Sequence, residues 1–226
     1  MSQGSRVLRL VIFDMAGTTV DDVIDGSPLV LVSYDEAFRR FGVEVPMEVL
    51  NEQRGRDKRR VIEEFGGEMA DEIYSCFVGL LLENAGRVKV VDGAREVFHF
   101  LRESGVKVAL NTGFPLEVAK RIIDHLGLAE SGYIDSWTCS EKVGESRPDP
   151  AMIHALMSEL GVEDPEAVMK IDDTAKGIEE GLHAGVTTLG VLTGTQSRER
   201  LQQANPHDII PSVKYLPSYL EEKGFL

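Results

Sequence analysis

The stretch that decides the fold is VIFDMAGTTVD, which spans residues 11–21. Three apolar residues lead directly to the carboxylate of Asp14, and a loop with one glycine and two threonines follows. A short apolar run that ends at such a loop is typical of a buried strand in a parallel sheet. Gly17 lets the backbone turn sharply, so we expect amide groups of Gly17 and Thr18 to point at an anion beside Asp14.

Further apolar runs of strand length recur along the chain, and most are followed by a segment with helical periodicity. This alternation predicts right-handed βαβ units that build a parallel sheet with helices on both faces, a doubly wound α/β fold. The expected strands cover residues 7–13, 106–110, 133–138, 168–171 and 187–192, and the helices that follow them cover 116–126, 151–160 and 178–184.

Residues 22–91 differ from the rest because they show helical periods and no convincing strand. Glycines and a proline separate the periodic stretches, as in short helix–helix connections. A helical insertion directly after the first strand would lie over the strand ends as a cap. The predicted domains are therefore a core of residues 1–21 and 92–226 and a cap of residues 22–91, with cap helices over 29–41, 47–54, 58–65 and 69–82.

Polar side chains that suit phosphoryl chemistry follow several of the expected strands, whose carboxyl ends share one edge of the sheet. A carboxylate such as Asp14 can attack phosphorus as a nucleophile, and a divalent cation must then offset the repulsion between two anions. Thr112 supplies a hydroxyl, Arg147 a cation and Asp173 a further acid, a set that stabilises a transferring phosphoryl group. Taken singly, Asp14 would cap a turn, Thr112 would cap a helix and Arg147 would form a surface ion pair; together they favour a phosphoryl site.

The overall charge limits the partners of the chain. Lys and Arg number 24 against 38 Asp and Glu, a net charge of −14, which argues against nucleic acid or an anionic membrane as partner. The sequence shows neither a signal peptide nor a membrane span. Cys76 and Cys139 lack metal-type spacing and are expected to be free thiols in a reducing compartment. We therefore expect a cytoplasmic protein that acts on a small phosphorylated or phosphonate metabolite.

The chain resembles the haloacid dehalogenase superfamily over nearly its whole length. Residues 11–21 match the first motif of that superfamily, and Thr112, Arg147 and Asp173 match the second, third and fourth. The resemblance implies that Asp14 is the nucleophile of an aspartyl-phosphate mechanism. It further implies that Asp14, the Ala16 carbonyl and Asp173 bind Mg²⁺, and that Thr112, Gly113 and Arg147 hold the phosphoryl oxygens.

Within this superfamily the sequence is most similar to the phosphonatase branch, the phosphonoacetaldehyde hydrolases. Phosphatases carry an acid where this chain has Ala16, and a methyl group cannot protonate a leaving alkoxide. Residues 170–185 match a second pattern of the branch. A cap lysine three residues after a glycine forms an imine with the aldehyde in phosphonatases, and Lys58, after Gly55, has this spacing. Phosphonatases are often homodimers, which the resemblance implies as a possible state here.

Three positions depart from the phosphonatase pattern, because Arg54, Val61 and Phe114 replace a methionine, a histidine and a tyrosine. Arg54 would bind a carboxylate or a second phosphate of the substrate. Arg54 and Arg56 would also lower the pKa of Lys58 by repulsion between like charges, Arg54 from the same helical face if this stretch is helical. Three alternatives stay open: the basic run 54–60 is a solvated face, the enzyme is a phosphatase without an imine, or the chain binds a phosphorylated ligand without catalysis.

Overall fold

The computed structural model describes residues 7–226, so the first six residues of the expected core segment 1–21 lie outside it. Six parallel strands form the main sheet in the order β10-β9-β8-β1-β6-β7. β1 lies in the middle, with Asp14 beside Asn111 of β6 and Phe13 beside Ile171 of β8. The predicted doubly wound α/β fold is confirmed. The strands are β1 (Leu10–Asp14), β6 (Lys107–Thr112), β7 (Ser136–Cys139), β8 (Val168–Asp172), β9 (Thr187–Val191) and β10 (Asp208–Ile210).

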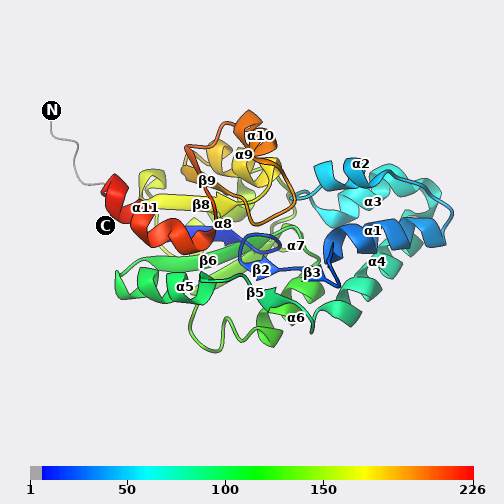
Figure 1. The fold of residues 1–226 in the computed structure, drawn as a ribbon, viewed down its shortest axis with the longest axis horizontal. Helices are drawn as coiled ribbons and strands as arrows, with labels where there is room; N and C mark the ends of the chain where they lie inside the picture. The colour runs from blue at the N-terminus through cyan, green and yellow to red at the C-terminus, as the bar shows by residue number, and fades with distance from the viewer. Residues whose placement is uncertain (1–6) are drawn as a thin grey trace.

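Helices cover both faces of this sheet, which explains why β1 is buried throughout and apolar up to Asp14 (Figure 1). Successive side chains of a strand point to opposite faces. Leu10 and Ile12 accordingly join one buried cluster, whereas Val11 and Phe13 join the other. The first face packs against α8 (Ala151–Glu159) and α9 (Ala175–His183), with α10 (Arg198–Gln203) beside α9, and the second packs against α5 (Ala94–Glu103), α6 (Leu116–His125) and α11 (Leu216–Lys223); α7 (Ser140–Val143) follows β7.

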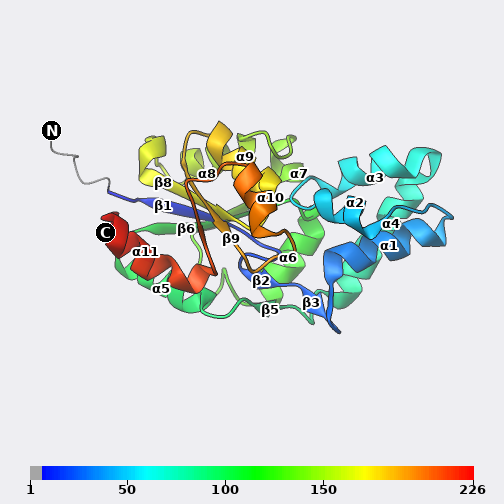
Figure 2. The same ribbon diagram turned by 45° about the horizontal axis from the view of Figure 1, so that its top comes forward.

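Four helices between β1 and α5 gather at one end of the molecule, beyond the carboxyl ends of the strands (Figures 1 and 2). We call α1 to α4 the helical group. Tyr34 stacks on Phe77 with 4.5 Å between ring centroids, so the group has an aromatic centre of its own. Within the described residues, no helix has both the length and the apolar character needed to cross a bilayer. The members are α1 (Leu29–Arg40), α2 (Met47–Glu52), α3 (Lys58–Gly66) and α4 (Ala70–Asn84), with a 3₁₀ turn, η1 (Gly67–Met69), before α4.

Short strands that the sequence did not predict flank the helical group. β2 (Val20–Asp21) pairs antiparallel with β5 (Lys89–Val90), where the two segments that connect the group to the sheet run side by side. β3 (Val23–Ile24) pairs with β4 (Ser27–Pro28) just before α1. The expectation of no strand within residues 22–91 was therefore wrong. Two residues are too few to show the alternation by which a strand is recognised.

Gly181 allows α9 to pack closely on the sheet. A Cβ at this position would overlap the Thr188 hydroxyl and lie 3.0 Å from Cβ of Lys170. We expect Gly181→Ala to lower the free energy of unfolding by about 1–3 kcal/mol through overpacking. Gly79→Ala is the matched control, because nothing lies within 4 Å of its added Cβ in α4. It should stabilise by about 0.5–1 kcal/mol. Urea denaturation of both variants measures this, and equal effects would contradict the packing argument.

Candidate active site

Asp14 is the last residue of β1 and lies almost fully buried at the carboxyl edge of the sheet. The loop after it is tight: Gly17 has φ of 87°, its amide donates to the Val20 carbonyl at 2.8 Å, and the Thr18 amide donates to the Met15 carbonyl at 3.1 Å. These two amides are thus engaged within the loop. The expectation that they point at an anion beside Asp14 does not hold in this conformation, because closing the loop uses both donors.

Three carboxylates meet beside this loop. Oxygens of Asp14, Asp172 and Asp173 lie within 4.8 Å of one another. Asp172 is committed elsewhere, since Nζ of Lys170 lies 2.9 Å from its Oδ2. Asp173 accepts a hydrogen bond from the Thr18 hydroxyl at 2.9 Å on Oδ1, while Oδ2 has no hydrogen-bond partner within residues 7–226. Burial raises the pKa of Asp173 to about 8; the positive charge of Arg54 opposes this rise, and the charges of Asp14 and Asp172 add to it.

This arrangement fits a divalent cation. An unpartnered buried carboxylate oxygen beside a second carboxylate is unfavourable until a cation joins them. Mg²⁺ prefers oxygen ligands, which Asp14, Asp173 and the Ala16 carbonyl offer. The backbone is also shaped around Asp173, because a Cβ on Gly17 would lie 2.5 Å from its Oδ2 and one on Gly194 would overlap it.

Arg147 is the cation nearest to Asp14, with 2.7 Å between its Nη1 and Oδ1 of Asp14. Its Nε donates to Glu180 Oε2 at 2.9 Å and its Nη2 donates to Asn111 Oδ1 at 2.8 Å. The side chain is 1% exposed, so the alternative of a surface ion pair is wrong. Three fixed acceptors hold the guanidinium in one orientation toward the aspartate.

The Arg147 network includes two residues to which sequence reasoning gave no role, Lys170 and Glu180. Both are fully buried, and Lys170 donates to Asn111 Oδ1 at 2.6 Å. The burial of Glu180 could have been inferred from the sequence of α9, because Gly177 and Gly181 lie on the helix face that packs closely on the sheet. A charged residue on such a face needs a buried partner.

Lys58 begins α3, where the side chain of Asp57 caps the helix by accepting from the Arg60 amide. The Lys58 side chain is buried, and its Nζ donates to the Arg56 carbonyl at 3.0 Å. The loop after β6 approaches closely, because a Cβ on Gly113 would lie 3.2 Å from this Nζ. The interpretation of the basic run as a solvated face is therefore wrong for Lys58, and equally for Arg54, which is 2% exposed.

Burial lowers the pKa of Lys58 to about 8, and the positive charges of Arg54 and Arg147 act in the same direction against the attraction of Asp14. The predicted repulsion by Arg54 is thus present but secondary to burial. Arg56 contributes a carbonyl acceptor instead. Arg54 does not share a helical face with Lys58, because α2 ends at Glu52 and a turn separates it from α3.

Most of the site residues predicted from the sequence, from both the core and residues 22–91, line one enclosed cavity. Its volume of about 20 Å³ leaves room for about one water molecule, so a substrate enters only when its walls move apart. Gly17, Thr18 and Asp173 lie outside the lining and cluster behind Asp14. The lining residues are Asp14, Ala16, Val30, Arg54, Gly55, Lys58, Thr112, Gly113, Phe114, Arg147 and Thr174.

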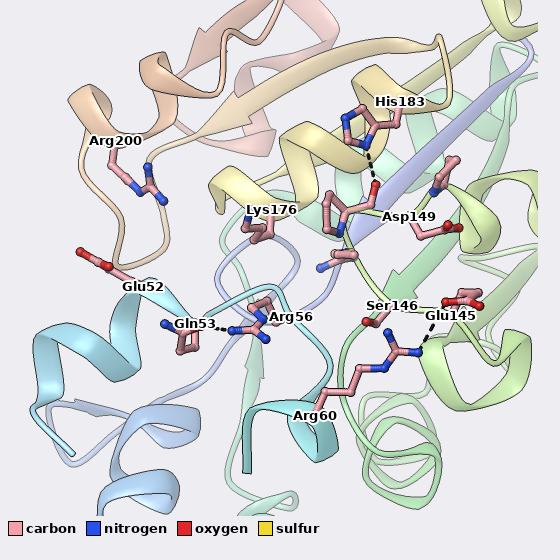
Figure 3. Close-up of a pocket in the computed structure, with 13 residues that line it drawn as sticks. Glu52, Gln53, Arg56, Arg60, Glu145, Ser146, Asp149, Lys176, His183 and Arg200 are labelled. Carbon is pink, nitrogen blue, oxygen red and sulfur yellow. Dashed lines mark hydrogen bonds and ion pairs between the residues drawn. The ribbon is translucent and has the colours of Figure 1, made fainter. Parts of the chain in front are cut away.

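A wide cleft of about 1010 Å³ adjoins this cavity, and Arg147 lines both. Figure 3 shows Arg56 and Arg60 on the side of the helical group and Lys176 on the side of α9. Arg200 adds a further positive charge. Five Lys or Arg side chains line the cleft against three acidic ones, Glu52, Glu145 and Asp149, so the approach to Arg147 is locally basic in an otherwise acidic chain.

Known proteins match both the sequence and the fold. A model of the haloacid dehalogenase-like hydrolases matches residues 8–185. The chain belongs to this family of hydrolases. It is 32% identical to the phosphonoacetaldehyde hydrolase of Bordetella pertussis, over 95% of this chain and 92% of that protein. It is 31% identical to that of Vibrio cholerae, over 95% and 94%. A phosphonoacetaldehyde hydrolase-like protein from Oleispira antarctica superposes with a TM-score of 0.83 at 26% identity, covering 96% of this chain and 92% of that one.

Removing the charge of Glu180 would leave Arg147 and Lys170 short of a buried anion. We expect Glu180→Gln to lower the free energy of unfolding by about 3–5 kcal/mol, the effect of breaking a buried ion pair. Glu179→Gln is the control, since this partly exposed neighbour forms its one ion pair within residues 7–226 with Lys176, at 2.6 Å, and its loss should change stability by less than about 1 kcal/mol. Denaturant titration compares them; a Glu180 variant as stable as the control would show that the network does not depend on this charge.

Proposed function

We propose that this hydrolase cleaves the carbon–phosphorus bond of phosphonoacetaldehyde or a related phosphonate aldehyde, giving an aldehyde and phosphate. One observation carries the proposal: the buried Lys58, whose pKa is lowered to about 8, lines the same cavity as Asp14, Thr112 and Arg147. A lysine amine attacks a carbonyl only when neutral, and burial favours the neutral form. The likeness to phosphonoacetaldehyde hydrolases of about 31% identity supports the same reaction.

The phosphorus end of the substrate is assigned to the core. A carboxylate oxygen of Asp14 attacks the phosphorus and forms an aspartyl phosphate, while the carbon–phosphorus bond breaks. Arg147 and the hydroxyl of Thr112, with the Gly113 amide, hold the phosphoryl oxygens. Mg²⁺ bound by Asp14, Asp173 and the Ala16 carbonyl would supply neutralisation of the phosphoryl charge. Water then hydrolyses the aspartyl phosphate to restore Asp14.

The carbon end is assigned to Lys58. Its amine condenses with the aldehyde carbonyl, and a water molecule leaves as the imine forms. When the carbon–phosphorus bond breaks, its electron pair moves into an enamine, so no carbanion is released. Protonation and hydrolysis of the enamine free the aldehyde and the lysine. Ala16 suits this chemistry, because no alkoxide leaves that would require an acid at that position.

We further propose that residues 22–91 act as a cap on a core of residues 1–21 and 92–226. The helical group has its own aromatic centre and joins the sheet through the two segments that pair as β2 and β5. The cavity of about 20 Å³ supports movement of this group, since the substrate cannot enter otherwise. Association into homodimers remains a prediction.

Borohydride reduction in the presence of phosphonoacetaldehyde tests the proposal. We expect the reagent to trap the imine, so that peptide mass mapping finds the label at Lys58 and not at Lys176 of the adjoining cleft. Lys58→Ala should reduce cleavage of the phosphonate to the uncatalysed rate, whereas Lys176→Ala should retain it. Rapid hydrolysis of a phosphate ester by the Lys58→Ala enzyme, with no label at Lys58 in the wild type, would instead indicate a phosphatase without an imine.

The pH dependence provides a second check. Lys58 is protonated below its pKa of about 8 and neutral above it, so kcat/KM for phosphonoacetaldehyde should rise with pH and level off above about 8. An ordinary lysine would place this rise near its usual value of 10.5. A phosphate ester at saturating Mg²⁺ serves as control, because its hydrolysis needs no imine and Mg²⁺ bound to Asp173 would keep that carboxylate ionised, so its profile should lack this inflection. A flat phosphonate profile between about pH 7 and 9 would contradict the role of Lys58.

A further inference from the structure

Arg54 is a second buried guanidinium in the catalytic cavity, and its donors are poorly matched. The residue lies in the turn between α2 and α3 and is 2% exposed. Its Nη2 lies 3.4 Å from Asp22 Oδ1 and 3.4 Å from the Ala16 carbonyl, both beyond the usual range of 2.7–3.2 Å. Its Nη1 has no hydrogen-bond partner within residues 7–226.

Arg147, in the same cavity, shows what a satisfied guanidinium looks like here. Its three nitrogens have acceptors at 2.7 to 2.9 Å. Leaving a buried charged donor unpaired is unfavourable, so a donor of this kind lining a binding cavity points to a partner that arrives with the ligand. A purely structural pair with Asp22 would be expected to bring both terminal nitrogens onto that carboxylate, yet only Nη2 approaches it.

We infer that Arg54 binds a second anionic group of the substrate, a carboxylate attached to the carbonyl carbon that Lys58 attacks. The inference rests on the proposed function and narrows its substrate class to 3-phosphono-2-oxo acids. Where such a substrate carries its carboxylate, phosphonoacetaldehyde has only a hydrogen atom on the carbonyl carbon, which leaves Arg54 without a partner. Arg54 lines the same cavity as Lys58. A planar carboxylate matches the fork of a guanidinium.

The reaction balances in the same way as for the aldehyde. Lys58 forms an imine with the 2-oxo group and releases water, the phosphoryl group passes to Asp14, and the electron pair of the carbon–phosphorus bond enters the enamine. Protonation and hydrolysis then release a 2-oxo acid. In sum, 3-phosphonopyruvate and water give pyruvate and phosphate, with Arg54 paired to the carboxylate throughout.

The test compares kcat/KM for 3-phosphonopyruvate and phosphonoacetaldehyde in the wild type, Arg54→Met and Asp22→Asn. We expect the wild type to favour the oxo acid, and Arg54→Met to reduce that preference by about 10- to 100-fold, the loss of one charged hydrogen-bonded contact. Asp22→Asn keeps the guanidinium and should keep the preference. Equal effects of both substitutions on both substrates would overturn the inference, because Arg54 would then act only as the partner of Asp22.

The experiment can distinguish an error in the proposed function from an error in the role of Arg54. If the wild type cleaves neither phosphonate, carbon–phosphorus cleavage is excluded, and the same three proteins are compared on phosphoglycolate and ethyl phosphate. A preference for the carboxylate-bearing ester that Arg54→Met removes would support carboxylate binding by Arg54 while overturning the 3-phosphono-2-oxo acid as substrate, and no preference would overturn both. Thermal melting checks that Arg54→Met folds; if it does not, Arg54→Lys, which keeps a point charge without the fork, should retain only part of the preference.

Discussion

Charge matching around Asp14 is the constraint on which the rest of this structure depends. A buried ion is tolerated only when an opposite charge and hydrogen bonds replace its hydration. Arg147 meets this condition by contacting Asp14, Glu180 and Asn111 at 2.7 to 2.9 Å, and these partners belong to β1, α9 and β6. One side chain thus ties the central strands to a covering helix at the edge where the chemistry is proposed. Oδ2 of Asp173 has no hydrogen-bond partner in the described part of the chain, which makes it suited to bind a metal ion.

The position of several site residues at this edge could be predicted from the sequence. The carboxyl ends of parallel strands lie along one edge of the sheet, and Asp14, Thr112 and Asp173 each lie at such an end. The helices of residues 22–91 were equally predictable, from their helical periodicity and from the glycines and proline that separate them. The two-residue strands and β10 were not, since they are too short for a periodic signal. Burial of Lys58 could not be foreseen from a basic run, because it depends on the approach of Gly113, a contact between distant segments.

The closed cavity links the position of the helical group to the reactivity of Lys58. Burial is the main reason for its lowered pKa, so an opened site would return the amine to water and to its protonated form. On the proposed mechanism, imine formation is therefore confined to the closed arrangement. The basic cleft beside Arg147 has the complementary role, since it lies open to solvent and can attract an anion before closure.

The site has two halves that differ in how firmly the sheet holds their residues, and this difference affects which substrates the site can accept. Strand ends and the Arg147 network fix the half that would hold phosphorus, and a change there disturbs the sheet. On the proposed mechanism, the turn from Arg54 to Lys58 supplies the half that faces carbon. It meets the core through Arg54 at the Ala16 carbonyl and through Asp57, which accepts a hydrogen bond from the Ser140 hydroxyl. On the same mechanism, substitution of Arg54 in this turn would alter which carbon skeleton is accepted, whereas the residues assigned to phosphorus lie in the core. An arginine there, where phosphonatases have methionine, is the kind of change that this division permits.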